Sequence, residues 1–128
     1  MRIDITNVRP KSLSAIEAVE HGVGYPDTSD TFVIAFIDDK PVGYLVANNH
    51  DFVVCIHAVY VLSDYRKRGV ATALINAVKG IVGVEELQLD CFARNRTAYS
   101  LYTKLGFEPY FVTMKCGRPN VSDASPSV

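Results

Sequence analysis

The chain has 128 residues, enough for one domain that buries a hydrophobic core without covalent staples. Apolar residues make up 48% and charged residues 21% of the chain, the balance of a globular protein rather than of a disordered or fibrous one. The net charge of -1 excludes a global electrostatic field that would recruit nucleic acid or a membrane surface, so any anion-binding site must be local.

The beginning of the chain contains a strand pattern, a helix pattern and a turn. Apolar and polar residues alternate over 2–7, which predicts a short strand. Helical spacing predicts a helix over 11–22 that stops at Gly22. The turn residues that follow include Asp27 and Asp30.

The rest of the chain alternates strand and helix patterns. We expect a hairpin of strands 31–38 and 41–48, a strand over 52–62, a helix over 70–81, a strand over 85–93, a helix over 95–107 and a last strand over 110–116. Residues 117–128 are rich in Gly, Pro and Ser and are predicted to be a disordered tail, which leaves residues 1–116 as one domain. This order predicts an α+β fold, in which helices flank a central mixed, mostly antiparallel sheet as an α/β/α sandwich.

The cysteines, the histidines and the hydropathy pattern indicate the cellular compartment and whether a metal or a membrane is involved. The three cysteines (Cys55, Cys91 and Cys116) form no C-x-x-C pair, which favours free thiols in a reducing compartment. Neither they nor the three histidines have metal-ligand spacing, so we expect no metal. No segment has the pattern of a signal peptide or of a membrane span of about 18 apolar residues. We expect a cytoplasmic monomer or homodimer that binds neither membrane nor nucleic acid.

The stretch "YRKRGVATAL" puts positive charge where a helix begins. Arg66, Lys67 and Arg68 precede Gly69, although the N-terminal end of a helix already carries positive potential. Unpaired N–H groups at a helix start bind anions, and glycine lets a ligand approach the backbone. The small Ala71 keeps the surface open, so the stretch suits a diphosphate. Two well-known phosphate-binding loops, G-x-x-x-x-G-K-[ST] and G-x-G-x-x-G, are absent from the sequence. The alternative interpretations of the stretch are a solvated loop and a nucleic-acid-binding patch.

Two motifs give the chain a family resemblance. R-x-x-G-x-A at 66–71 and N-x-x-A-x-x-x-Y-x-x-x-G-F at 95–107 occur in the order, and on the elements, of the GNAT superfamily of N-acetyltransferases. The chain resembles this family over residues 1–116, and its motifs are most similar to those of protein N-terminal acetyltransferases of the ribosomal-alanine type. The resemblance implies transfer of an acetyl group from acetyl-CoA to a primary amine, of a small molecule or a protein, by direct attack in a ternary complex.

The resemblance also implies a cofactor site. The pyrophosphate of coenzyme A would lie on the loop amides, the pantetheine arm would pair with the preceding strand, and Asn95 would contact that arm or serve only as a helix N-cap. The implied cofactor residues are Val59, Tyr60, Val61, Arg66, Lys67, Arg68, Gly69, Val70, Ala71, Thr72, Asn95 and Tyr102.

The implied catalytic residues are Tyr102, Asp90 and His57. Tyr102 matches the family tyrosine beside the thioester sulfur, where a phenol protonates the departing thiolate. Asp90 stands where the ribosomal-alanine enzymes carry a glutamate, so the shorter acid favours a water relay. His57 lies where several relatives carry a carboxylate, and histidine exchanges protons near neutral pH. The base is left open between Asp90, His57 and a water relay, and a backbone N–H near Val61 would stabilise the oxyanion.

Other residues near these motifs have simpler explanations. Cys91 is expected to be a buried thiol rather than a nucleophile, because neighbouring residues of a strand point to opposite faces of the sheet. Tyr99 is expected to pack or to contact the acceptor, and Asp27 and Asp30 to meet a cationic amine or only solvent. The competing functions are a catalytically silent CoA-binding module and a nucleic-acid binder.

Overall fold

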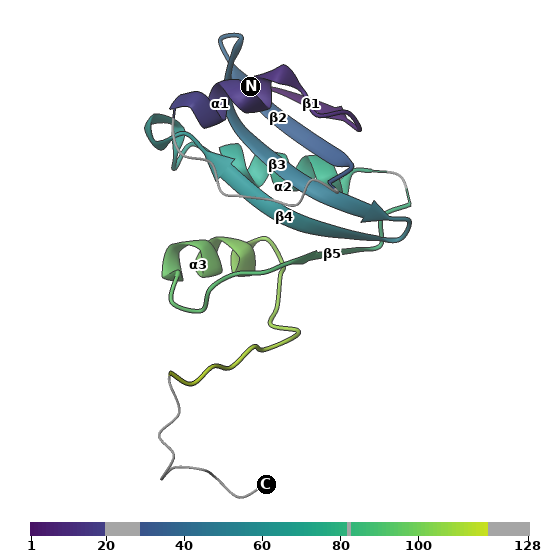
Figure 1. Ribbon diagram of the computed structural model, residues 1–128, viewed down its shortest axis with the longest axis vertical. Helices are drawn as coiled ribbons and strands as arrows, with labels where there is room; N and C mark the ends of the chain where they lie inside the picture. Colours follow the sequence, from purple (N-terminus) through teal and green to yellow (C-terminus); the bar gives the residue numbers. More distant parts are fainter. Residues whose placement is uncertain (20–28, 82, 118–128) are drawn as a thin grey trace, which may run out of the picture. The chain divides into compact units, whose positions relative to one another are not determined.

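The computed structural model describes residues 1–19, 29–81 and 83–117 (Figure 1). The chain divides into two compact units, the first from Met1 to Phe92 and the second from Ala93 onward. The expected helix end at Gly22, the turn residue Asp27 and the tail from 118 to 128 lie outside the described residues.

The first unit is built on one sheet with the strand order β1-β2-β3-β4-β5. The strands are β1 (Arg2–Thr6), β2 (Thr31–Ile37), β3 (Lys40–His50), β4 (Val53–Val61) and β5 (Glu86–Leu89). The first four strands pair antiparallel, and β5 pairs parallel to β4. The β2–β3 hairpin turns through Asp38 and Asp39, whose φ values of 51° and 61° suit aspartate, because its short side chain tolerates the left-handed region.

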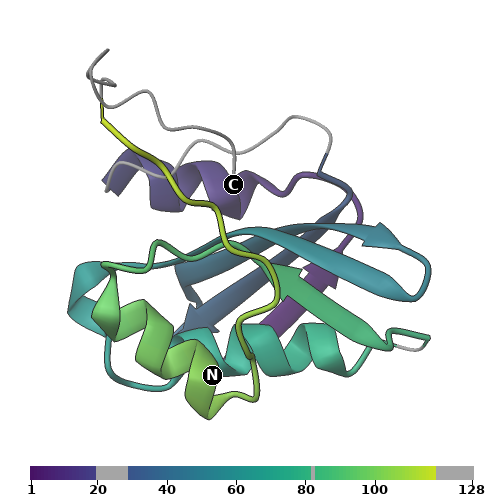
Figure 2. The ribbon, with the colours of Figure 1, turned by 90° about the horizontal axis from the view of Figure 1, so that it is seen from below.

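Two helices cover this sheet, one on each face (Figure 2). Helix α1 (Lys11–Val19) buries Leu13 and Ile16, and helix α2 (Val70–Lys79) buries its apolar stripe on the other face. The cluster under α1 consists of Leu13, Ile16, Phe32, Ile34, Tyr44, Val46, Ala58 and Leu62. The stripe of α2 consists of Val70, Leu74, Ile75 and Val78. The expected sheet with helices on both faces is therefore confirmed.

The second unit contains helix α3 (Arg96–Lys104), which has a recognisable signal at each end. The side chain of Asn95 caps its N-terminus by accepting a hydrogen bond from the Ala98 N–H at 3.2 Å. At the C-terminus Gly106 has φ 97°, and the Phe107 N–H donates to the Tyr102 carbonyl at 2.9 Å. This bond is one of the pair that defines a Schellman motif, which explains the "LGF" of the sequence.

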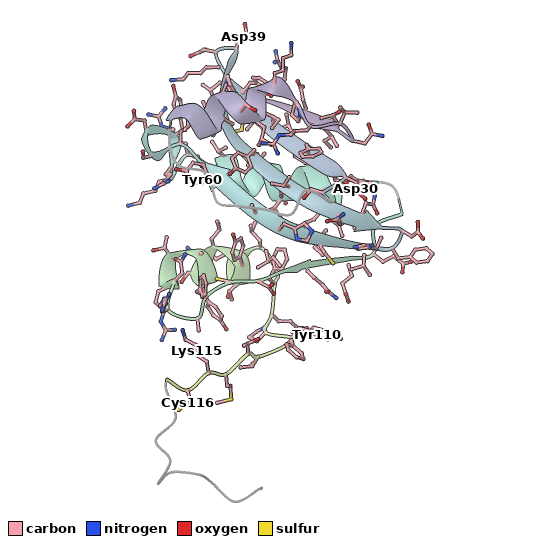
Figure 3. The ribbon with its side chains drawn as sticks, in the orientation of Figure 1. Asp30, Asp39, Tyr60, Tyr110, Lys115 and Cys116 are labelled. Carbon is pink, nitrogen blue, oxygen red and sulfur yellow. The ribbon has the colours of Figure 1, made fainter. Side chains whose placement is uncertain are left out.

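The strand expected over 110–116 is absent from the described residues, so that prediction is wrong. Residues 110–117, which begin with the Tyr110 labelled in Figure 3, run without regular structure. The side chains of Tyr110, Phe111 and Met114 are each at least 85% exposed. Apolar and β-branched residues indicate that a segment suits a sheet, but a strand forms only where a partner backbone accepts its hydrogen bonds.

Replacing Leu74 of α2 by alanine should destabilise the first unit. The Leu74 side chain is fully buried (0% exposed), and removing buried methyl groups costs about 2–5 kcal/mol of unfolding free energy. Urea denaturation followed by circular dichroism measures this loss. The matched control is Asn76→Ala, an exposed position on the same helix, which should leave the midpoint nearly unchanged. Equal midpoints for both variants would contradict the packing described above.

Candidate functional site

Strand β4 is paired with β5 over only part of its own length. Their parallel pairing runs from Val53↔Glu86 to Ile56↔Leu89, whereas β4 continues to Val61. Among the described residues, β4 beyond Ile56 therefore has a strand neighbour only on its β3 side. We call the point after Ile56 and Leu89, where the two strands separate, the fork. An open strand edge of this kind can bind an extended, amide-rich ligand through main-chain hydrogen bonds.

One hydrogen bond at the end of β4 shows which way the N–H and C=O groups of this strand point. The Leu62 N–H donates to the Val42 carbonyl of β3 at 2.8 Å. Because the hydrogen-bonding direction alternates along an antiparallel strand, Val59 and Val61 direct their N–H and C=O groups away from β3. The Val61 carbonyl accepts a bond from Arg66 Nε at 2.9 Å. The N–H of Val61 thus faces the open edge, where the sequence predicted an oxyanion donor.

His57 lies at the fork on a β-bulge. β3 pairs with Ala58 and, at its next residue, with Ile56, so His57 is the extra residue of β4. A bulge of this kind changes the direction of a side chain. The His57 ring is exposed, and its Nε2 is hydrogen-bonded to Oδ1 of Asn48 on β3. The sequence did not indicate Asn48 as its partner, because nothing local relates these two residues.

Asp90 stands on the other side of the fork. It follows Leu89 directly, and its side chain is exposed. His57 and Asp90 are thus the first residues past the last pair of β4 and β5, so the two candidate bases occupy corresponding positions. Cys91 is half-buried, and its thiol donates to the Phe92 carbonyl at 3.5 Å.

The loop from β4 to α2 presents backbone N–H groups. A short 3-10 turn, η1 (Ser63–Tyr65), leads to Lys67 with φ 62° and Gly69 with φ 80°. The helical ladder of α2 starts with the bond from Ala73 N–H to the Gly69 carbonyl at 3.0 Å. The N–H groups of residues 70–72 precede that ladder, and Gly69 caps the helix without a side chain. This end of α2 is therefore suited to an anion.

Aromatic rings surround the cations of this loop. The Arg66 guanidinium lies 5.5 Å from the centre of the Tyr60 ring. Arg68 and Lys40 both lie over Tyr65, at 5.3 and 5.5 Å from its centre. Lys40, which sequence reasoning missed, reaches the loop from the distant β2–β3 turn. Arg66 both holds the Val61 carbonyl at the end of β4 and adds positive charge to the loop.

The remaining predicted site residues lie in the second unit, Tyr102 on α3 and Asn95 at its N-cap. Tyr102 is half-buried, and its ring meets the Phe107 ring edge-on with centroids 5.8 Å apart. The Asn95 side chain serves as the N-cap. The predicted cofactor and catalytic residues therefore divide between the two units, with all but Asn95 and Tyr102 in the first.

The described residues contain neither a metal-binding cluster nor a membrane-spanning helix. Within them, no group of three His, Cys, Asp or Glu side chains is arranged to hold a metal ion. No helix among them has the length and the apolar content required to span a bilayer.

Known proteins with related sequences include acetyltransferases. Residues 8–107 match the model of the acetyltransferase (GNAT) family. An N-alpha-acetyltransferase of Sulfurisphaera tokodaii is 30% identical over an alignment of 93 residues, and the match covers 60% of this chain and 56% of that protein. An N-alpha-acetyltransferase of Saccharolobus solfataricus is 30% identical over 98 residues, with the same coverage. The chain thus spans little more than half the length of these curated relatives.

Solved structures with similar folds include two kinds of acetyltransferase. Aminoglycoside N-acetyltransferase AAC(6')-Iy, in complex with CoA, matches with a TM-score of 0.65 and 25% identity, over 90% of this chain and 100% of that one. Arabidopsis thaliana Naa50, in complex with a bisubstrate analogue, matches with a TM-score of 0.66 and 24% identity over 83% of each chain. The second likeness, at this identity, concerns the fold alone.

Proposed function

Because the chain belongs to the acetyltransferase (GNAT) family, we propose that it transfers the acetyl group of acetyl-CoA to the nitrogen of a primary amine. The acceptor is an amine of a small molecule or of a peptide or protein. The nitrogen attacks the thioester carbonyl directly, a tetrahedral intermediate forms, and the carbon–sulfur bond breaks to release CoA as a thiol. The residues of the chain serve to bind the thioester, stabilise the oxyanion and move two protons.

The observation that carries this proposal is the fork, because it leaves β4 open directly before the loop into α2. The open edge from Val59 to Val61 offers main-chain groups to the amides of a pantetheine arm. The loop amides and the start of α2 lie next along the chain and suit the pyrophosphate. Salt-sensitive attraction from Lys67 and Arg68 adds to this binding.

The remaining candidate residues serve proton transfer and stabilisation of the oxyanion. Attack by nitrogen requires a base, since an ammonium ion has no lone pair, and His57 and Asp90 both flank the fork. The Val61 N–H is aimed at the open edge, where it can stabilise the oxyanion. Tyr102 protonates the leaving thiolate. These roles follow the motif positions together with the fork and form part of the proposal.

The proposal also includes the organisation and setting of the protein. Residues 1–116 act as one N-acetyltransferase domain, as a monomer or a homodimer. All three cysteines are free, which agrees with a reducing, cytoplasmic setting.

Titration calorimetry with acetyl-CoA, followed by thiol release against amines, tests the function. We expect a dissociation constant in the micromolar range that rises with added salt, because the loop cations are exposed. The amine panel contains short peptides with free N-termini and aminoglycosides, and mass spectrometry identifies each acetylated product. Binding without turnover on any amine would instead favour a catalytically silent CoA-binding module. Absence of binding would contradict the proposal altogether.

A further inference from the structure

Three polar residues form a row across the sheet on the side covered by α1, beyond the apolar cluster under that helix. Thr31 pairs with Ala47, and Asp30, the residue before it, donates its N–H to the Ala47 carbonyl (3.1 Å), which places Asp30 beside the end of β3 that carries Asn48. Asn48 is next to His57 through their side-chain bond. Figure 3 shows Asp30 toward the end of the sheet where β3 turns into β4. The row of Asp30, Asn48 and His57 thus ends at the fork.

The end of β3 that carries Asn48 is held in place. Asp30 Oδ1 accepts bonds from the backbone N–H of Asn49 at 2.8 Å and from the Thr31 hydroxyl at 2.9 Å. Asn48 itself is half-buried, whereas His57 is exposed. A fixed amide beside a solvent-facing imidazole can orient that ring.

The chemistry of the contact selects one tautomer of His57. An amide oxygen only accepts hydrogen bonds, so the ring nitrogen that meets Asn48 Oδ1 must carry a proton. In the neutral ring the proton is then on Nε2, and Nδ1 keeps its lone pair. A base needs that lone pair on the atom that faces its substrate.

We propose that Asn48 is a positioning residue, which holds His57 in the Nε2–H form so that Nδ1 is the atom that takes the proton from the acceptor nitrogen. This inference rests on the proposed function. The N–H bond of the attacking amine breaks and an Nδ1–H bond forms, which leaves an imidazolium whose Nε2–H still donates to Asn48. The exposed ring then returns the Nδ1 proton to water.

Two carboxylates and one thiol lie on the elements around the contact between Asn48 and His57. Asp30 stands on the β2 side of Asn48, Cys55 faces Asn48 from β4, and Asp90 follows the end of β5. In this proposal His57 takes the proton, and Asp90 has no assigned part in that step.

The ring nitrogens of His57 can be observed directly by long-range nitrogen–proton NMR of the 15N-labelled full chain above neutral pH. His57→Gln assigns the signal. We expect the unaltered protein to show the Nε2–H tautomer, Asn48→Leu to show a mixture of tautomers, and Asn48→Asp, which still offers an acceptor oxygen, to restore Nε2–H. A predominant Nδ1–H signal in the unaltered protein would overturn the proposal, since Asn48 would then present its NH2 group to Nε2.

Measurements of turnover test whether the tautomer of His57 affects catalysis. We expect Asn48→Leu to lower kcat by roughly tenfold, which is less than the loss expected when a general base is removed altogether. The KM for acetyl-CoA should be unchanged. Asn48→Asp should recover most of that loss. Asn49→Leu, the exposed neighbour on β3, is the matched control and should behave as the unaltered protein. Acetyl-CoA titration verifies that each variant is folded.

Failure of the inference can be told from failure of the proposed function. If the unaltered protein releases no thiol with any amine, the proposed function is wrong and the inference falls with it. If the unaltered protein is active and Asn48→Leu loses the Nε2–H signal while keeping full turnover, only the inference is overturned.

Discussion

Replacing Gly69 by glutamate should abolish acetyl-CoA binding, with the dissociation constant raised beyond the range that calorimetry can measure. Gly69 has φ 80° and caps α2, and a Cβ built there meets no atom within 4 Å. The added carboxylate would project into the space where the proposal puts the pyrophosphate, and like charges at a helix N-terminus repel. The positive φ also costs about 1 kcal/mol for a residue other than glycine.

The matched control separates this charge effect from backbone strain. Gly83 has φ 89°, and a Cβ built there also meets no atom within 4 Å, so Gly83→Glu adds the same strain and charge in the turn before β5. We expect Gly83→Glu to bind acetyl-CoA normally and Gly69→Ala to bind it with only a modest loss. Equal binding by Gly69→Glu and the unaltered protein would show that the start of α2 is not the pyrophosphate site.

Replacing Tyr102 by phenylalanine should lower kcat by roughly 100-fold, as expected when a general acid is removed. The change deletes one hydroxyl and keeps the ring, so the edge-on contact with Phe107 is retained. Because the hydroxyl acts on the departing thiolate and not on the bound thioester, the affinity for acetyl-CoA should stay the same. Stopped-assay thiol release and calorimetry measure the two quantities separately.

Tyr99 supplies the control for this experiment. It lies on the same helix, is 38% exposed, and its replacement by phenylalanine removes the same hydroxyl. We expect Tyr99→Phe to keep near-normal turnover. A Tyr102→Phe protein with unchanged turnover would remove Tyr102 from the mechanism, and a loss of cofactor affinity in that variant would assign its hydroxyl to binding.

Local sequence signals predicted most of the elements well. The helix over 95–107 was expected from Asn95 and Gly106, and the structure has α3 at Arg96–Lys104 with those two residues at its ends. The strand expected over 52–62 became β4 at Val53–Val61. Such signals involve residues within one turn of a helix or along one strand, so they can be recognised in the sequence alone.

Long-range pairing was harder to predict, as the segment over 110–116 illustrates. Its apolar and aromatic residues matched a strand pattern, yet Phe111 and Met114 are exposed and no strand forms there among the described residues. The partner of a strand is set by the whole sheet rather than by the strand's own composition. The pairing of Asn48 with His57 was missed for the same reason.

The sequence by itself determined the family, the helix start with its cations and Gly69, and the identity of the candidate acid and bases, because each depends on residue types at short spacing. Only the tertiary structure decided that β4 and β5 separate after Ile56 and Leu89. That separation brings His57 and Asp90 to one fork, and the bulge in β4 brings His57 to Asn48. Strand register and bulges depend on hydrogen bonds between strands that are distant in the sequence, and no local pattern specifies them.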